Sequence, residues 1–163
     1  MSLVVRINSK HIVLVGASGA GKSTLAPMLA KHLELASIDT DELIDGVGPL
    51  TGGQIIEKSG IKEFRKIEKR VILQALARKT PAVYATGAGA WSIEPVRSLC
   101  RERAISIWLD VPFAELVSRV KDSDRVILRS RSASIVIAEQ ISNRSQFYAQ
   151  TDIRIDCGVS EPK

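Results

Sequence analysis

The sequence predicts a three-layer α/β fold, in which a five-stranded parallel sheet carries helices on both faces. Two observations indicate this fold. Short apolar runs typical of strands recur at wide spacing, and helical stretches separate them. A glycine-rich loop also joins the first run to a helix, which is a common unit of parallel sheets. The strand candidates are residues 11–15, 37–39, 81–85, 104–109 and 153–156.

The composition is that of an ordinary globular chain. Its 163 residues predict one domain over residues 1–163, and its 45% hydrophobic and 25% charged residues are typical of such proteins. No apolar run approaches membrane-spanning length, and no signal segment opens the chain. Cys100 and Cys157 lie in no C-x-x-C motif, so we expect a reducing cytoplasm. We also expect a monomer that does not associate with a membrane.

The net charge of +5 allows two interpretations. A basic surface can bind nucleic acid, but the arginines form no single run and aromatic residues make up only 4% of the chain. An enzyme that uses a nucleotide and an anionic second substrate also needs local positive charge. We favour the enzyme and expect no nucleic-acid partner.

Residues 16–24, GASGAGKST, follow the first strand candidate and lead into a predicted helix over residues 25–33. The pattern G-x-x-x-x-G-K-[ST] in this setting predicts a P-loop, whose backbone N–H groups bind phosphate; a plain turn is the less favoured alternative. Lys22 supplies a cation for the β- and γ-phosphates, and Ser23 a hydroxyl for Mg²⁺. Pro27 lies inside the helix and should kink or loosen a turn. The predicted nucleotide-binding residues are Gly19, Ala20, Gly21, Lys22, Ser23 and Thr24.

Asp39 and Asp41 follow the second strand candidate, at the end of a strand where ligands gather in open α/β sheets. One carboxylate could hold Mg²⁺, often through water, and the other could accept a proton from a substrate hydroxyl. Alternatively, one of them caps a short helix over residues 42–45. The spacing alone does not separate these interpretations.

Residues 46–60 are rich in glycine, and residues 61–79 predict a long helix with an apolar stripe. Arg65 and Glu68 lie three residues apart on this helix and can pair, although such a pair on its own would be solvated and would contribute little stability. Gly87 and Gly89 follow the third strand candidate, where small residues let backbone N–H groups approach a ligand; a plain turn is the alternative.

A helix starts near residues 110–112 and ends near residues 119–120, and a polar, arginine-rich segment follows. In a phosphoryl-transfer enzyme this segment, about 121–133, is a candidate lid that places an arginine on the γ-phosphate. In an unknown protein, a surface loop with solvated charges would be the better interpretation. Residues 133–148 are predicted to be helical and carry Arg144.

Taken together, these residues give the chain a resemblance to shikimate kinases, a family of P-loop kinases, along its whole length. The order and spacing of several elements agree with the family pattern. These are Asp39-Thr40-Asp41, Gly60 followed by Phe64-Arg65 and Glu68, Gly87-Ala88-Gly89, Arg125 in the lid, and Arg144 four residues before Tyr148.

The resemblance implies that ATP, with Mg²⁺, phosphorylates the 3-hydroxyl of shikimate. It implies that Lys22 and Ser23 bind ATP and Mg²⁺, that Asp39 reaches the metal through water, that Arg119 lies by the adenine and that Arg125 closes on the phosphates.

On the acceptor side, the resemblance implies that Asp41 binds the ring hydroxyls and assists deprotonation. Arg65 and Arg144 would bind the shikimate carboxylate, since arginine can donate two hydrogen bonds to a planar carboxylate. Glu68 would orient Arg65. The turn Gly87-Ala88-Gly89 would offer backbone N–H groups to the substrate. The implied catalytic residues are Lys22, Asp41 and Arg125.

The chain departs from the family pattern at a few positions. Ala88 replaces the central glycine of a triple-glycine turn, so either its methyl group intrudes on the ring or the backbone there suits alanine. Ile56 stands where the family often has phenylalanine, and Val126 replaces the proline of the lid. Two alternatives therefore stay open: a kinase for another polyol acid such as gluconate, and a non-catalytic kinase-like binding module.

Overall fold

The computed structural model describes residues 9–121 and 131–158. The strands are β1 (His11–Val15), β2 (Ala36–Asp39), β3 (Ala82–Ala85), β4 (Ala104–Asp110) and β5 (Ile153–Asp156). The α-helices are α2 (Lys22–Leu33), α3 (Thr40–Asp45), α4 (Gly52–Leu76), α5 (Glu94–Arg103), α6 (Phe113–Val120) and α8 (Ala133–Tyr148), and a 3₁₀ turn, η1, covers Ala90–Ser92.

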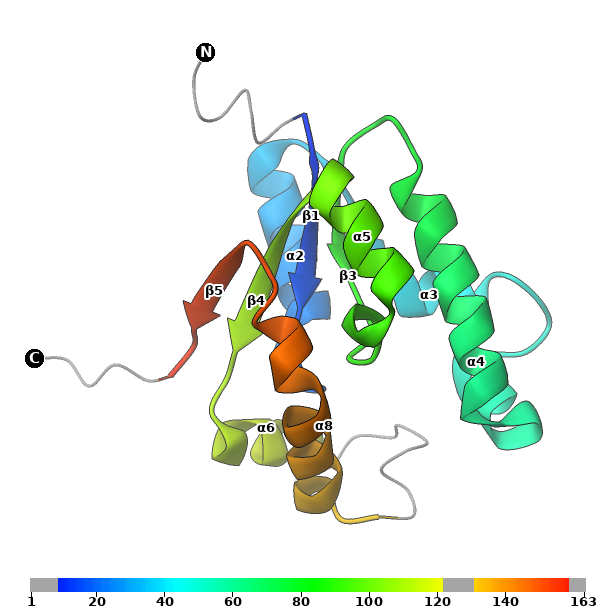
Figure 1. Cartoon of the computed structure of the whole chain (residues 1–163), viewed down its shortest axis with the longest axis vertical. Helices are drawn as coiled ribbons and strands as arrows, with labels where there is room; N and C mark the ends of the chain where they lie inside the picture. The colour runs from blue at the N-terminus through cyan, green and yellow to red at the C-terminus, as the bar shows by residue number, and fades with distance from the viewer. Residues whose placement is uncertain (1–8, 122–130, 159–163) are drawn as a thin grey trace, which may run out of the picture.

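The five strands form one parallel sheet in the order β2-β3-β1-β4-β5 (Figure 1). Strand β1 lies at the centre, where Val13 is in register with Tyr84 of β3 and with Ser106 of β4. The predicted five-stranded parallel sheet is therefore confirmed. Because every strand runs in the same direction, the segments that follow β1, β2 and β3 emerge at the same end of the sheet.

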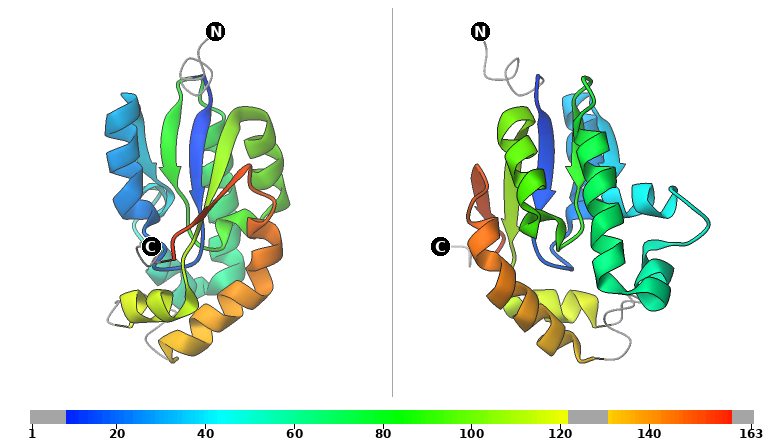
Figure 2. Two further views of the ribbon diagram at one scale, coloured as in Figure 1. Left: turned by 90° about the vertical axis from the view of Figure 1, so that its left-hand side faces the viewer. Right: turned by 45° about the vertical axis from the view of Figure 1, so that its right-hand side comes forward.

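Helices cover both faces of the sheet (Figure 2). Along β1, Ile12 and Leu14 join a core cluster with Ala26 and Ala30 of α2. The alternate residues Val13 and Val15 point to the other face and join a cluster with residues of α4 and α5. This alternation explains why β1 is apolar from Ile12 to Val15, since a central parallel strand is buried on both faces. Within the described residues, no helix is long and apolar enough to span a membrane.

Helix α4 begins earlier than the sequence analysis expects. Its first turn lies inside the glycine-rich segment, and Thr51 caps it by accepting a hydrogen bond from the Gln54 N–H (3.3 Å), while the Gln54 side chain accepts one from the Thr51 N–H (2.9 Å). Gly60 then interrupts the helix with φ 82° and ψ 166°, a conformation that is essentially restricted to glycine. The helix ends at Leu76, three residues before the expected end.

Helix α2 continues from Lys22 to Leu33 through Pro27 without a non-helical residue, so of the two expected effects the helix is consistent with a loosened turn. Proline still removes one N–H from the helix, so the Ser23 carbonyl lacks the partner that it would have four residues later. The helix tolerates this loss where Ala26 and Ala30 pack it firmly onto β1 and β3.

Candidate active site

The P-loop follows β1 and wraps around the start of α2. Gly21 precedes the helix with φ 91°, a left-handed conformation that glycine adopts without strain. The Lys22 side chain is largely buried, and its Nζ donates to the carbonyl oxygens of Gly16 (2.8 Å) and Ala17 (2.9 Å). A cation is thus held within the loop, next to the N-terminal end of a helix, where phosphate binds favourably.

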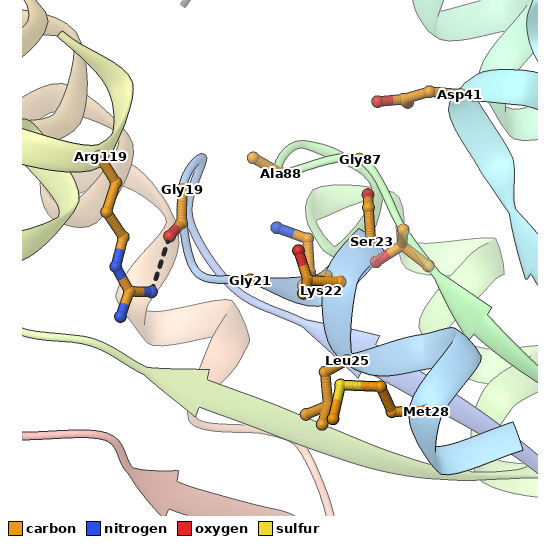
Figure 3. A pocket seen from close by; sticks show the side chains of 12 residues that line it. Gly19, Gly21, Lys22, Ser23, Leu25, Met28, Asp41, Gly87, Ala88 and Arg119 are labelled. Atoms are coloured by element: carbon orange, nitrogen blue, oxygen red, sulfur yellow. Dashed lines mark hydrogen bonds between the residues drawn. The ribbon is translucent and has the colours of Figure 1, made fainter. Parts of the chain in front are cut away.

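A pocket of about 550 Å³ opens over this loop (Figure 3). Its floor is the P-loop and the start of α2, and Arg119 and the turn after β3 line its sides. Of the residues predicted to bind nucleotide, Arg125 lies outside the described residues, and among the described ones Ala20 does not line the pocket: its side chain is buried, and its N–H donates to the Ala17 carbonyl (3.2 Å). The pocket residues from that set are Gly19, Gly21, Lys22, Ser23, Thr24 and Arg119.

Asp39 caps helix α3 with one carboxylate oxygen and contacts the P-loop with the other. Its Oδ1 accepts a hydrogen bond from the Asp41 N–H (2.9 Å) and caps α3, and its Oδ2 accepts one from the Ser23 hydroxyl (2.6 Å). The pair of hydroxyl and carboxylate presents hard oxygen ligands beside the phosphate-binding loop, so these two residues fit a Mg²⁺ ion.

Arg119 on α6 lies at the other side of the loop. Its guanidinium donates to the Gly19 carbonyl (3.1 Å; Figure 3). It also pairs with Glu115. Gly19 has φ 82°, and a Cβ at that position would lie 2.7 Å from the Val120 side chain. The loop and α6 therefore meet so closely that only glycine fits.

Arg65 and Glu68 pair on α4, but the pair is not the solvated one that the sequence analysis describes. The Glu68 side chain is only 1% exposed and that of Arg65 28% exposed. Burial is the main reason why the pKa of Glu68 is raised above its ordinary value, and the charge of Arg65 opposes this shift. The Oε1 atom of Glu68 is buried and has no hydrogen-bond partner among the described residues.

The glycine turn after β3 packs against this pair. A Cβ on Gly89 would lie 2.1 Å from the guanidinium of Arg65, and one on Gly87 would lie 2.9 Å from Glu68 Oε1 and 3.1 Å from Asp41 Oδ1. The absence of side chains at the two glycines is what allows Arg65, Glu68 and Asp41 to come together here. Ala88, between them, has no left-handed backbone conformation, so alanine is unstrained and its methyl group faces the pocket.

Two residues to which the sequence analysis gave no role hold this turn in place. Tyr148, at the end of α8, donates its hydroxyl to the Ala88 carbonyl (2.7 Å), and the Thr40 hydroxyl accepts from the Gly87 N–H (3.2 Å). Thr40 lies within the Asp-Thr-Asp motif, but its residue type alone does not indicate that it contacts the turn after β3.

Arg144 approaches the same group of residues from helix α8. It lies one turn before Tyr148 on α8. Burial raises the pKa of Tyr148, and the charge of Arg144 and a hydrogen bond with it oppose this shift. The charge of Arg144 also opposes the upward shift of the Glu68 pKa that burial causes. The structure thus brings Asp41, Arg65 and Arg144 together around the glycine turn, while Arg125 lies outside the described residues.

The family model for shikimate kinase matches residues 18–163. The chain belongs to the shikimate kinase family. A shikimate kinase of Mesorhizobium japonicum is 35% identical over 155 residues, which cover 94% of this chain and 76% of that protein. A shikimate kinase of Rhodopseudomonas palustris is 38% identical over 154 residues, 94% of this chain and 75% of the relative. Family membership confirms shikimate kinase activity and the use of ATP.

Solved structures agree with this assignment. A shikimate kinase from Acinetobacter baumannii in complex with shikimate matches with a TM-score of 0.87 and 28% identity, over 96% of this chain and 89% of that one. A gluconokinase from Sinorhizobium meliloti matches with a TM-score of 0.61 at 18% identity, over 95% of this chain and 85% of that one, which indicates a shared fold alone.

Proposed function

We propose that this shikimate kinase transfers the γ-phosphate of ATP to the 3-hydroxyl of shikimate at the boundary between the P-loop pocket and the glycine turn. The observation that carries the proposal is the convergence of Asp41, Arg65 and Arg144 around that turn, next to a pocket whose floor is the P-loop. In support, Asp41 lines the pocket over the P-loop and lies beside Gly87, in the turn that also packs against Arg65.

On the nucleotide side, the P-loop amides and Lys22 would hold the phosphates, and Lys22 would exchange its two carbonyl contacts for phosphate oxygens. Ser23 and Asp39 would hold Mg²⁺, which supplies charge neutralisation for the phosphates when it is bound. Arg119, whose guanidinium already lies at the pocket wall, would contact the base.

On the acceptor side, Arg65 and Arg144 would bind the carboxylate of shikimate by paired N–H donors. Glu68 would hold Arg65 in the orientation that this requires, because its buried carboxylate fixes one end of the guanidinium. Asp41 would accept the proton of the attacking hydroxyl, and Gly87 and Gly89 would let their backbone approach the ring. Rate enhancement would come from positioning and charge neutralisation.

Other parts of the proposal rest on the resemblance. Arg125, within the expected lid of about 121–133, would approach the γ-phosphate and act as a catalytic residue. The single domain over 1–163, the monomeric state and the cytoplasmic location stay predictions.

The test is coupled ADP release by the purified protein, with shikimate compared against gluconate and nucleoside monophosphates. We expect turnover with shikimate that requires Mg²⁺ and exceeds turnover with the other acceptors. Absence of turnover above background with shikimate would overturn the proposal. Preference for gluconate would assign the pocket to a different polyol acid, and calorimetric binding without ADP release would indicate a binding module.

A further inference from the structure

A buried pair of hydrogen bonds joins the P-loop to helix α8. The Ser18 N–H donates to Gln140 Oε1 (3.0 Å), and Gln140 Nε2 donates to the Ser18 hydroxyl (3.1 Å). The two residues are 5% and 6% exposed. Ser18 is part of the P-loop but does not line the nucleotide pocket, so its N–H is directed at the helix instead of at the phosphate site.

Gln140 is the first of three residues that repeat at intervals of four along α8. Gln140 binds the P-loop, Arg144 lies on the acceptor side and Tyr148 binds the glycine turn through the Ala88 carbonyl. Residues four apart lie on the same face of a helix. One face of α8 therefore touches the phosphate site, the carboxylate site and the turn between them, and the helix packs against α6 at one end and η1 at the other (Figure 1).

Apolar packing alone would not fix the loop in one position. Ala17 and Ala20 of the loop share a core cluster with Ile137, one turn before Gln140. Such contacts are non-directional, whereas two hydrogen bonds to a planar amide define both distance and orientation. Because the pair is buried, loss of the Gln140 side chain would leave the Ser18 N–H without its acceptor in a place that water reaches poorly.

We infer that Gln140 is a positioning residue, which fixes the P-loop relative to Arg144 and so aligns the γ-phosphate of ATP with the acceptor hydroxyl. The part of this inference that concerns the acceptor rests on the proposed function. The expected effect of Gln140 on nucleotide binding does not rest on it. Gln140 touches the loop and no reacting group. It acts through Ser18 and through the rigidity of α8.

The experiment replaces Gln140 with methionine, an unbranched side chain of similar length that adapts to cores. We expect Gln140→Met to weaken ADP binding by about three- to tenfold, the effect of one or two lost hydrogen bonds, and to raise the KM for ATP in parallel. The kcat should fall as well, because misalignment of reacting groups is costly, while the KM for shikimate changes little. Ser18→Ala retains the backbone N–H donor and should give a smaller effect.

Val136→Ala is the matched control, since Val136 is buried one turn before Gln140 on the same face of the helix but has no side-chain group that can hydrogen-bond to the P-loop. It should lower the melting temperature without a change in ADP affinity. The inference is overturned if Gln140→Met leaves ADP affinity unchanged, or changes it no more than Val136→Ala does at an equal loss of melting temperature. ADP binding is measured by calorimetry without shikimate, so failure of the acceptor assignment would not affect this outcome.

Discussion

The two arginines proposed to bind the carboxylate, Arg65 and Arg144, come from helices α4 and α8, and the proposal can be tested at Arg144. Arg144→Ala should raise the KM for shikimate by roughly 10- to 100-fold, because hydrogen bonds to charged groups are the stronger ones, while the KM for ATP changes little. Steady-state kinetics with each substrate varied in turn measures this difference. Equal effects on both KM values would contradict the assigned role, and Arg101→Ala, at an exposed arginine of α5, serves as the control.

Glu68 is a second test at the residue scale, because its burial gives a pH dependence of known sign. Its pKa is raised in the folded protein, chiefly by burial, so the folded protein holds the proton more tightly than the unfolded chain does. The free energy of unfolding therefore falls as the pH rises above 4.5, the ordinary pKa of a glutamate, because the unfolded chain then loses the Glu68 proton first. The loss of stability reaches its full size once the pH exceeds the raised pKa of Glu68 in the folded protein.

Glu68→Gln removes this ionisation while keeping the shape and an acceptor oxygen. We expect this variant to be at least as stable as the unchanged protein at pH 7, and we expect its advantage to shrink as the pH falls to about 4.5. The KM for shikimate should nevertheless rise, because Arg65 loses its anionic partner. Urea unfolding between pH 4.5 and 7.5 measures the first effect. An advantage that grows toward low pH would contradict it.

At the scale of elements, the break in α4 is the feature that sets the direction of the segment carrying Arg65 and Glu68. Gly60 has φ 82° and ψ 166°, and a Cβ there would meet no atom within 4 Å, so any cost of substitution comes from the backbone alone. Gly60→Ala should lower the free energy of unfolding by about 1–3 kcal/mol, as measured in urea.

The matched control is Gly48→Ala, since Gly48 also has open space around it but has no left-handed conformation. We expect a change within about 0.5 kcal/mol there. Equal losses at the two positions would mean that the break at Gly60 carries no special strain for an L-residue.

The sequence indicated most elements of the fold because their signals are local. The buried strands are short apolar runs, and the P-loop pattern itself marks the junction of β1 and α2. The start of α4 was missed because glycines suggested a loop, although Thr51 and Gln54 form a capping box that can be recognised in sequence. The burial of Glu68 could not be predicted from the local sequence, since it depends on the approach of Gly87 from the turn after β3.

The resemblance identified candidates for both subsites, but it did not supply the contacts that hold them in place. Ser18 and Gln140 are 122 residues apart, and nothing in either local sequence indicates that they meet. The same holds for Tyr148 and Ala88, which are 60 residues apart. Both pairs join helix α8 to a loop that is distant in the sequence, so they can be recognised only once the position of α8 in the fold is known.

At the scale of the whole molecule, the parallel sheet is what brings the candidate site together. The P-loop follows β1, Asp39 ends β2, and the glycine turn follows β3, so three functional segments leave the same end of the sheet. Because β1 lies between β3 and β4, the loop at its end faces segments from both sides, as in other open α/β sheets where ligands bind beyond the strand ends. Helix α8 adds Arg144 from outside the sheet.

Because both subsites exist only in the folded chain, a ligand that binds at either of them should raise the free energy of unfolding of the whole chain. A ligand at about 100 times its dissociation constant adds about 2.7 kcal/mol to the free energy of unfolding, which corresponds to a rise of roughly 5–10 °C in the melting temperature of a chain of this size. Lys22→Met should abolish the rise caused by ADP, because the buried cation is lost, but should retain the rise caused by shikimate. Lys31→Met, at an exposed lysine of the same helix, should retain both. If ADP still stabilises Lys22→Met as much as it does the unchanged protein, the nucleotide does not bind through the P-loop cation.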